Sequence, residues 1–160
     1  MSASSPSPAH GLSASSRPTE ETVKDYLCAA ALHNVAAVRF FIERIGLHPD
    51  ASFGGKPSAL CYAVLKPHHG LLDYLLRRGA DVSLQDAMAM TPLHYAAMGG
   101  CHCCLARLIA AGAPLNAVNY SGLTPLGLTL GKQHLAGIRT FLECHGAGLE
   151  EGQPQPKRFH

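Results

Sequence analysis

The sequence has no long apolar run, no apolar segment near its beginning and no strong excess of charge of either sign. No stretch approaches the ~20 apolar residues that a membrane-spanning helix needs, so we expect no membrane partner. Residues 1–20 are rich in Ser and Pro and lack the apolar core of a signal peptide, which predicts a cytoplasmic or nuclear location, or both. A formal net charge of +2, with Lys and Arg scattered along the chain, argues against binding to nucleic acid.

The sequence also lacks the motifs of nucleotide binding and of covalent catalysis. It contains no P-loop and no GxGxxG segment. Its ten histidines are spread over the chain, and no spacing of Ser, His and an acidic residue suggests a catalytic triad. We therefore expect a protein that is not an enzyme and that holds no cofactor.

The most informative feature that is present is an internal repeat, with a period of about 33 residues. The segment 91–97 (TPLHYAA) is followed one period later by 124–126 (TPL). It is preceded, again by one period, by 58–63 (SALCYA). The motif therefore recurs on both sides of its best copy.

Two further landmarks keep the same period. Gly46, Gly79 and Gly112 follow one another at this interval. The apolar runs of the second, third and fourth units also superpose with this spacing, and they occupy residues 71–76, 104–109 and 137–142. Because three independent landmarks agree, the period is structural, and each unit is one repeated element of the fold.

The third unit shows how each repeat is built. Thr91 has the hydroxyl of a helix N-cap, and Pro92 suits the first helical position, where its missing N–H would have had no partner. The segment 93–97 supplies a narrow apolar face for close helix packing. The two glycines at 99–100 end this helix and let the chain turn back into a second helix through 104–109.

A repeat of this period with T-P-L-H-x-A in its first helix resembles the ankyrin repeat family, and the resemblance covers about residues 25–147. It implies an all-α fold, a solenoid of helix-turn-helix units with short β-hairpin-like fingers. We expect a disordered, Ser/Pro-rich tail at 1–20 and a second disordered tail at 148–160. Between them lies the predicted repeat domain, 21–147, with units at about 25–57, 58–90, 91–123 and 124–147.

Three departures from the family pattern before the fourth unit bear on the expected local structure. Asp25 stands where the family has Thr, which suits an N-terminal capping repeat with helices predicted at 26–33 and 36–45. Residues 54–57 (GGKP) replace the usual finger sequence, so the shape of that finger tip is left open. Ala89 replaces a glycine that has positive φ in the family, and we therefore expect its finger to be wider or shifted.

The fourth unit is expected to be the least stable. Gly127 takes the place of the motif histidine, and Gly131 and Gly137 fall within its two predicted helices, where each glycine costs up to ~1 kcal/mol. We therefore expect this unit to fray. Its closing Gly146 comes one residue late, which predicts an insertion near His145 in the last helix.

The six cysteines are predicted to be free thiols, because no secretory signal is seen and disulfides are rare in reducing compartments. Cys28 and Cys61 precede His94 by two repeats and by one, so we expect them to fill the same slot as small buried residues of the inner helices. For His94 the resemblance implies a structural role, with hydrogen bonds near the Thr cap and to the adjoining loop.

Residues 101–104 (CHCC) have the composition of a metal site but not its spacing. Zinc ligands converge from separated pairs, whereas consecutive helix residues point around the axis, and only Cys101 and Cys104 share a face. Cys104 also occupies a core slot that Leu71 fills one unit earlier. We expect no metal here but a helix start with two exposed thiols. A metal- or redox-responsive protein that uses Cys101, Cys103 and Cys104 is the alternative function.

The resemblance implies a non-enzymatic protein–protein interaction module, a scaffold or adaptor that binds a protein partner on a concave surface of fingers and inner helices. In the family, contacts come mainly from the finger tips and from the inner-helix positions just after the buried Leu and Ala. The matching positions, all apolar or aromatic, are Tyr62, Met88, Met90, Tyr95, Met98, Tyr120 and Leu123. An exposed stripe of Met and Tyr suits the apolar side chains of a partner.

Several alternatives stay open at the level of sequence. The rings of Tyr62 and Tyr95 can instead pack against neighbouring inner helices. The side chains of Met88 and Met90 can fold back onto the stack. The partner's identity is open too, since the resemblance allows a substrate adaptor of a ubiquitin ligase, a transcriptional cofactor or a kinase inhibitor. The sequence does not set the oligomeric state, for which a monomer is the expectation.

Overall fold

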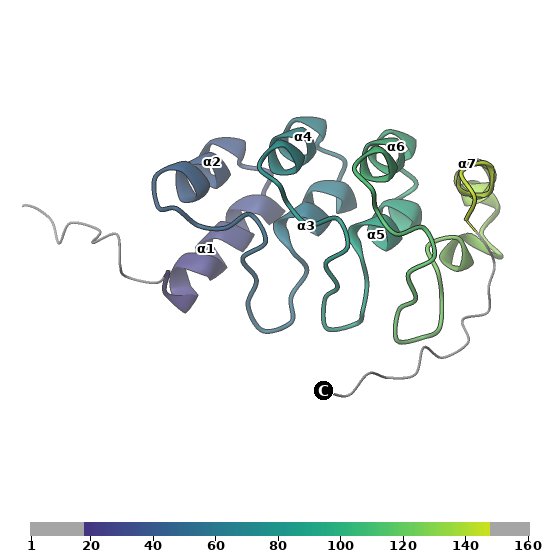
Figure 1. Ribbon diagram of the computed structural model, residues 1–160, viewed down its shortest axis with the longest axis horizontal. Coiled ribbons are helices and arrows are strands. Elements are labelled where there is room, and N and C mark those ends of the chain that lie inside the picture. Colours follow the sequence, from purple (N-terminus) through teal and green to yellow (C-terminus); the bar gives the residue numbers. More distant parts are fainter. Residues whose placement is uncertain (1–17, 148–160) are drawn as a thin grey trace, which may run out of the picture.

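The computed structural model describes residues 18–147, which form a stack of helix pairs with two rows of helices (Figure 1). The inner row consists of α1 (Glu20–Ala31), α3 (Ala59–Leu65) and α5 (Pro92–Gly99). The outer row consists of α2 (Val35–Glu43), α4 (His69–Arg77), α6 (His102–Ala110) and α7 (Ala136–Cys144). Long loops, here called fingers, project from the edge of the inner row (Figure 1). The predicted all-α solenoid of helix-turn-helix units is confirmed.

Helices are the only regular elements that carry the stack. No strand is formed between residues 18 and 147, so the fold rests on helix packing alone in this part of the chain. None of its helices is long and apolar enough to cross a bilayer.

The capping chemistry predicted for the third unit is confirmed in α5. Thr91 Oγ1 accepts a hydrogen bond from the backbone N–H of His94 (3.4 Å), and His94 Nδ1 accepts one from the N–H of Thr91 (3.1 Å). Pro92 takes the first helical position. Gly100 ends the helix with φ 74°, a left-handed conformation that glycine adopts without steric cost.

The core runs through the whole stack because each helix pair buries equivalent positions. Leucines fill most of them, and those that are at most 1% exposed are Leu60, Leu71, Leu72, Leu75, Leu93, Leu105, Leu108, Leu126 and Leu142. Ala63 and Ala96, one repeat apart on the packed helices α3 and α5, are fully buried. Side chains this small let neighbouring inner helices approach closely, as the sequence predicted.

The first helix begins earlier than the sequence predicted. α1 starts at Glu20 because Thr19 is its N-cap and accepts a hydrogen bond at Oγ1 from the N–H of Thr22 (3.3 Å). Asp25 lies inside α1, so its interpretation as the start of the helix was wrong. Thr19 and Glu20, assigned to the predicted N-terminal tail, therefore belong to the cap and the start of α1, and residues 1–17 and 148–160 of the two predicted tails lie outside the described residues.

The fourth unit keeps its outer helix but not its inner one. In place of an inner α-helix it has two 3₁₀ turns, η1 (Gly127–Thr129) and η2 (Gln133–Leu135), as its glycine content favours. The outer helix α7 forms in spite of Gly137, because Ile138 and Leu142 are buried in the stack. Fraying of this unit stays a prediction.

The extra residue of the fourth unit lies before α7. Both ends of this helix come one position later than the repeat period predicts from the ends of α6, so all of it is shifted. The N–H of Ala147 bonds to the carbonyl of Leu142, as that of Ala113 bonds to Leu108, with 3.0 Å in both cases. The predicted insertion near His145 was wrong, because the sequence pattern did not show that the 3₁₀ segment adds the residue.

Candidate protein-binding surface

Fingers join each outer helix to the inner row of the next unit. Within the described residues they are the first finger (46–57), the second finger (79–90) and the third finger (112–123). Equivalent side chains fold the tips of the second and third fingers, Asp86 and Asn119. Asp86 Oδ1 accepts hydrogen bonds from the backbone N–H groups two and four residues later, both at 2.9 Å. Asn119 Oδ1 does the same, at 2.9 and 3.0 Å, so the two tips share one conformation.

The second finger is neither wider nor shifted, although Ala89 replaces the expected glycine. Ala89 has φ 57°, in the same left-handed region as Gly122 with φ 75°. The N–H of Ala89 bonds to the carbonyl of Asp86 at 2.9 Å, as that of Gly122 bonds to Asn119. The expectation of a distorted finger was wrong, because the bonds of Asp86 hold the alanine in a conformation that costs roughly 1–2 kcal/mol.

Hydrogen bonds also join each finger tip to the next. The N–H of Ala87 donates to the carbonyl of Gly55 (2.9 Å), and the N–H of Tyr120 donates to the carbonyl of Met88 (3.1 Å). The first tip, left open by the sequence, turns through Gly54 and Gly55, both with positive φ. A Cβ on Gly55 would lie 2.7 Å from the Cβ of Ala87, so this contact requires glycine. The fingers therefore form one continuous edge.

Tyr95 ties the second finger to the inner row. Its hydroxyl donates a hydrogen bond to Asp86 Oδ2, the second oxygen of the carboxylate that folds the finger tip. Burial, followed by this bond to Asp86, raises the pKa of Tyr95 well above its ordinary value, so the hydroxyl is a donor at neutral pH. The ring is half-buried against the core. Tyr95 thus has a structural contact on one side and a partly open face on the other.

The seven predicted contact residues fall into two groups by exposure. The exposed ones are Met88 (59%), Met98 (38%), Tyr120 (76%) and Leu123 (39%). The half-buried ones are Tyr62, Met90 and Tyr95. Met90 lies between two fingers, where its Sδ accepts a hydrogen bond from Asn119 Nδ2 (3.3 Å). The structure therefore brings Met88 and Tyr120 together on neighbouring tips, and it joins Met90 of the second finger to Asn119 of the third.

Other exposed apolar side chains were missed by sequence reasoning. Leu32, 79% exposed, follows α1 and lies two repeat periods before Met98. The repeat register was therefore the signal that would have found it. Phe40 (52%) on the outer helix α2 and Leu130 (46%) after η1 are also exposed. Neither stands at a position that the family pattern marks for contacts.

The structure joins Cys101 and Cys104 in a disulfide. Cys101 is the N-cap of α6, and its Sγ accepts a hydrogen bond from the N–H of Cys104 (3.2 Å), which brings the two sulfur atoms together across the first turn. The prediction of free thiols was wrong for this pair, and so was the exposure expected for Cys101, which is only 9% exposed. Cys103 is exposed, as predicted.

The slot shared by Cys28, Cys61 and His94 differs between units. Cys61 is buried as predicted, and burial raises the pKa of its thiol to about 11. Cys28 is exposed, contrary to the prediction, because α1 is the first helix of the described stack and has an inner-row neighbour on one side only. His94 is fully buried and bonds to the carbonyl of Leu123, which confirms its structural role. Between residues 18 and 147, no three His, Cys, Asp or Glu side chains could hold a metal ion.

The chain is similar to known repeat proteins. Residues 60–151 match the family described as "Ankyrin repeats (3 copies)". An ankyrin repeat protein of fowlpox virus (strain NVSL), FPV216, is 36% identical over 116 residues, which are 66% of this chain and 39% of the viral protein. Ankyrin repeat domain-containing protein 37 of Mus musculus is 32% identical over 84 residues, 51% of this chain and 53% of the relative.

NF-kappa-B inhibitor alpha of Rattus norvegicus is 36% identical over 86 residues, 50% of this chain and 25% of that protein. The chain thus spans about half or less of the length of these three relatives.

Proposed function

Because the chain belongs to the ankyrin repeat family, whose repeats are protein–protein interaction modules, we propose that it is a non-enzymatic scaffold or adaptor for a protein partner. The partner binds to the finger tips and the inner row. One observation carries the proposal: Met88 (59% exposed) and Tyr120 (76% exposed) stand on neighbouring tips whose backbones are hydrogen-bonded to each other. Tips held in this way have little conformational entropy to lose when a partner docks.

The proposed contact surface is the set of apolar and aromatic residues expected from the family pattern. It comprises Tyr62, Met88, Met90, Tyr95, Met98, Tyr120 and Leu123. Exposed methionine adapts its shape to a partner, and tyrosine adds contact area at low entropic cost. Three of its members, Tyr62, Met90 and Tyr95, are half-buried, and the other four are exposed.

The same surface fits more than one role. A ubiquitin-ligase substrate adaptor, a transcriptional cofactor and a kinase inhibitor would all use it, and the name of one relative, NF-kappa-B inhibitor alpha, favours an inhibitory role among these. We place the protein in the cytoplasm or nucleus as a monomer, with the predicted repeat domain, 21–147, extended to the cap at Thr19 and lying between two tails. Protein is the proposed partner, because a net charge of +2 offers little attraction for nucleic acid.

The test compares the parent chain with two matched variants. The tip variant carries Met88→Ser and Tyr120→Ser, and the control carries Phe40→Ser, which removes an exposed aromatic side chain from the outer row. Proximity labelling with the intact chain identifies partners, and calorimetry then measures the affinity of a purified partner for all three proteins. We expect a loss of about tenfold or more in the tip variant only. Equal affinities in proteins with equal melting temperatures would place the interface elsewhere.

A second candidate function rests on the Cys101–Cys104 disulfide, which favours a redox-responsive protein. Two thiols would lose two electrons and two protons as the S–S bond forms, and a disulfide such as oxidised glutathione would be reduced to two thiols. Thiol counting by mass spectrometry in glutathione buffers tests this. A midpoint inside the range of cellular glutathione would support a switch, and a pair that never changes state would contradict it. Stoichiometric zinc in the purified protein would indicate a metal site instead.

A further inference from the structure

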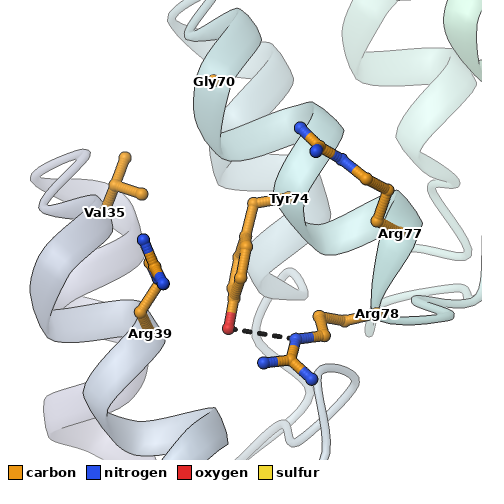
Figure 2. Close-up of a pocket in the computed structure, with 6 residues that line it drawn as sticks. All are labelled: Val35, Arg39, Gly70, Tyr74, Arg77 and Arg78. Carbon is orange, nitrogen blue, oxygen red and sulfur yellow. Dashed lines mark hydrogen bonds between the residues drawn. The ribbon is translucent and has the colours of Figure 1, made fainter.

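A hollow of about 510 Å³ opens between the outer helices α2 and α4. It is lined by Val35, Arg39, Gly70, Tyr74, Arg77 and Arg78 (Figure 2). The outer row lies on the side of the inner row away from the finger tips (Figure 1). The hollow is therefore separate from the proposed contact surface, and its volume is that of a site for a small ligand group.

The Tyr74 side chain organises two of the three arginines. It reaches from α4 towards Arg39 on α2, and Arg78 lies beside its hydroxyl (Figure 2). The guanidinium carbon of Arg39 is 5.7 Å from the ring centroid, and that of Arg78 is 5.4 Å away. Arg78 Nε donates a hydrogen bond to Tyr74 Oη (3.3 Å), and Tyr74 Oη donates to Glu43 Oε1 (3.1 Å). The two guanidiniums are thus positioned before any ligand arrives.

The arginines around the hollow outnumber the carboxylates that pair with them. Glu43 Oε1 accepts from Arg78 Nη2 (2.5 Å) and lies 3.5 Å from Arg39 Nε. Its bonds to Arg78 and then to Tyr74 lower the pKa of Glu43, so it is ionised at neutral pH. Asp73 is nearby, but its carboxylate pairs with Arg107 at 2.9 Å. Three guanidiniums against one available carboxylate leave a surplus of two positive charges.

Donors for a ligand also remain on these arginines. Arg77 bonds through Nε to the backbone carbonyl of Asp73 (3.3 Å), and it takes part in no ion pair within residues 18–147. Arg39 meets Glu43 through Nε. Each of these two side chains therefore keeps both terminal NH₂ groups, the pair that binds a planar or tetrahedral anion at two points.

We propose that this hollow binds a phosphomonoester carried by a protein partner, that is, a phosphorylated side chain. Such a group carries about −1.5 to −2 charge at neutral pH and three acceptor oxygens, which matches the surplus of two positive charges better than one carboxylate does. Forked guanidinium donors suit it in geometry as well as charge. The outer helices would then recognise a phosphorylated residue of the partner, in addition to any contact that the fingers make.

The test uses the full chain and a fluorescein-labelled Gly/Ser peptide with one phosphoserine, beside its unphosphorylated twin. Fluorescence anisotropy is measured for the parent, for Arg39→Gln combined with Arg77→Gln, and for Arg44→Gln. Arg44 is an exposed arginine at the end of α2 that does not line the hollow, so its replacement shows the effect of losing one positive charge outside the site. We expect the phosphopeptide to bind at least about tenfold more tightly than its twin, and the double variant to lose that preference.

The second part of the test is a variant that should gain affinity for the phosphopeptide. Glu43→Gln removes the competing carboxylate, so it should bind the phosphopeptide more tightly than the parent does, a result that misfolding cannot produce. The Met88→Ser and Tyr120→Ser variant should bind it like the parent, which separates this site from the finger tips. Equal binding of the two peptides, or an equal loss in Arg44→Gln, would overturn the proposal. Inorganic phosphate that binds as tightly as the phosphopeptide would overturn the assignment to a protein partner.

Discussion

His94 Nε2 lies 3.0 Å from the carbonyl oxygen of Leu123, and this bond joins the inner helix of the third unit to the finger that follows it. A carbonyl only accepts, so Nε2 carries the proton, and Nδ1 is the atom that accepts from the N–H of Thr91. The fully buried ring is therefore neutral, and burial lowers its pKa below the ordinary value. One uncharged side chain thus connects a helix cap, a helix and a finger.

Lowering the pH is expected to destabilise the protein through His94. Because the native pKa is lower than the unfolded value of about 6.5, the unfolded chain takes up the proton first as the pH falls. The contribution of the neutral His94 ring to the free energy of unfolding is therefore fully present above about pH 6.5. It is lost as the pH falls from there towards the native pKa. Urea unfolding at pH 7.5 and pH 5.0 measures the decrease.

The decrease should be smaller in His94→Gln and unchanged in the control His134→Gln, whose side chain is exposed. His33 has a pKa lowered mainly by burial and contributes in the same direction, so some decrease should remain. A parent protein that is equally stable at both pH values would contradict this account of His94.

Replacing Ala89 by glycine is expected to stabilise the protein by about 0.5–1 kcal/mol. Glycine relieves roughly 1–2 kcal/mol of left-handed strain at φ 57°, and its greater freedom in the unfolded chain offsets about half of that gain. Thermal unfolding measures the change. Ala87→Gly, one position before Met88, is the matched control, and it should lower the melting temperature because φ there is not positive. A lower melting temperature for Ala89→Gly would show that the second finger has another conformation.

Tyr95→Phe is expected to cost about 1–2 kcal/mol, although it keeps the ring. The change removes the hydroxyl that donates to Asp86 Oδ2 and leaves that half-buried oxygen without this donor. Tyr120→Phe removes the hydroxyl of a 76% exposed side chain, so its unfolding free energy should equal that of the parent. Equal unfolding curves for all three proteins would mean that the bond between finger and inner helix adds nothing to stability.

Leu108→Ala and Leu142→Ala are each expected to cost about 2–5 kcal/mol, because both side chains are fully buried at equivalent positions of α6 and α7. Ile109→Ala should lower the free energy of unfolding by less, because Ile109, the neighbour of Leu108, is only half-buried. Chemical denaturation of the three variants gives the comparison. A negligible cost for Leu142→Ala alone would show that the fourth unit is already unfolded when the rest of the stack is folded.

Local chemistry explains what the sequence predicted correctly. Three features of α5 depend only on atoms within a few residues, so the local sequence predicts them. They are the cap at Thr91, the first-turn Pro92 and the helix end at Gly100. The internal repeat places the same local signals in each unit, which is why the order of helices in the first three units and most of the buried leucines were predicted. The stripe of Met and Tyr at the fingers was found by the same register, and its binding role stays a proposal.

The tertiary structure decided the features that depend on neighbours in other units. Cys28 and Cys61 occupy one slot by sequence, yet only Cys61 has helices on both sides and is buried. The extra residue of the fourth unit is absorbed ahead of α7, where two 3₁₀ turns replace the inner helix. Ala89 differs from these cases, because bonds within its own finger tip hold it in the conformation of a glycine.

Arg39 and Tyr74 meet only because α2 and α4 lie side by side in the outer row, so no spacing in the chain marks the hollow between them. Sequence by itself therefore determined the repeat and its helix caps, whose causes lie within a few residues. Burial and charge clusters were decided by packing between repeats, since these depend on which units become neighbours in space.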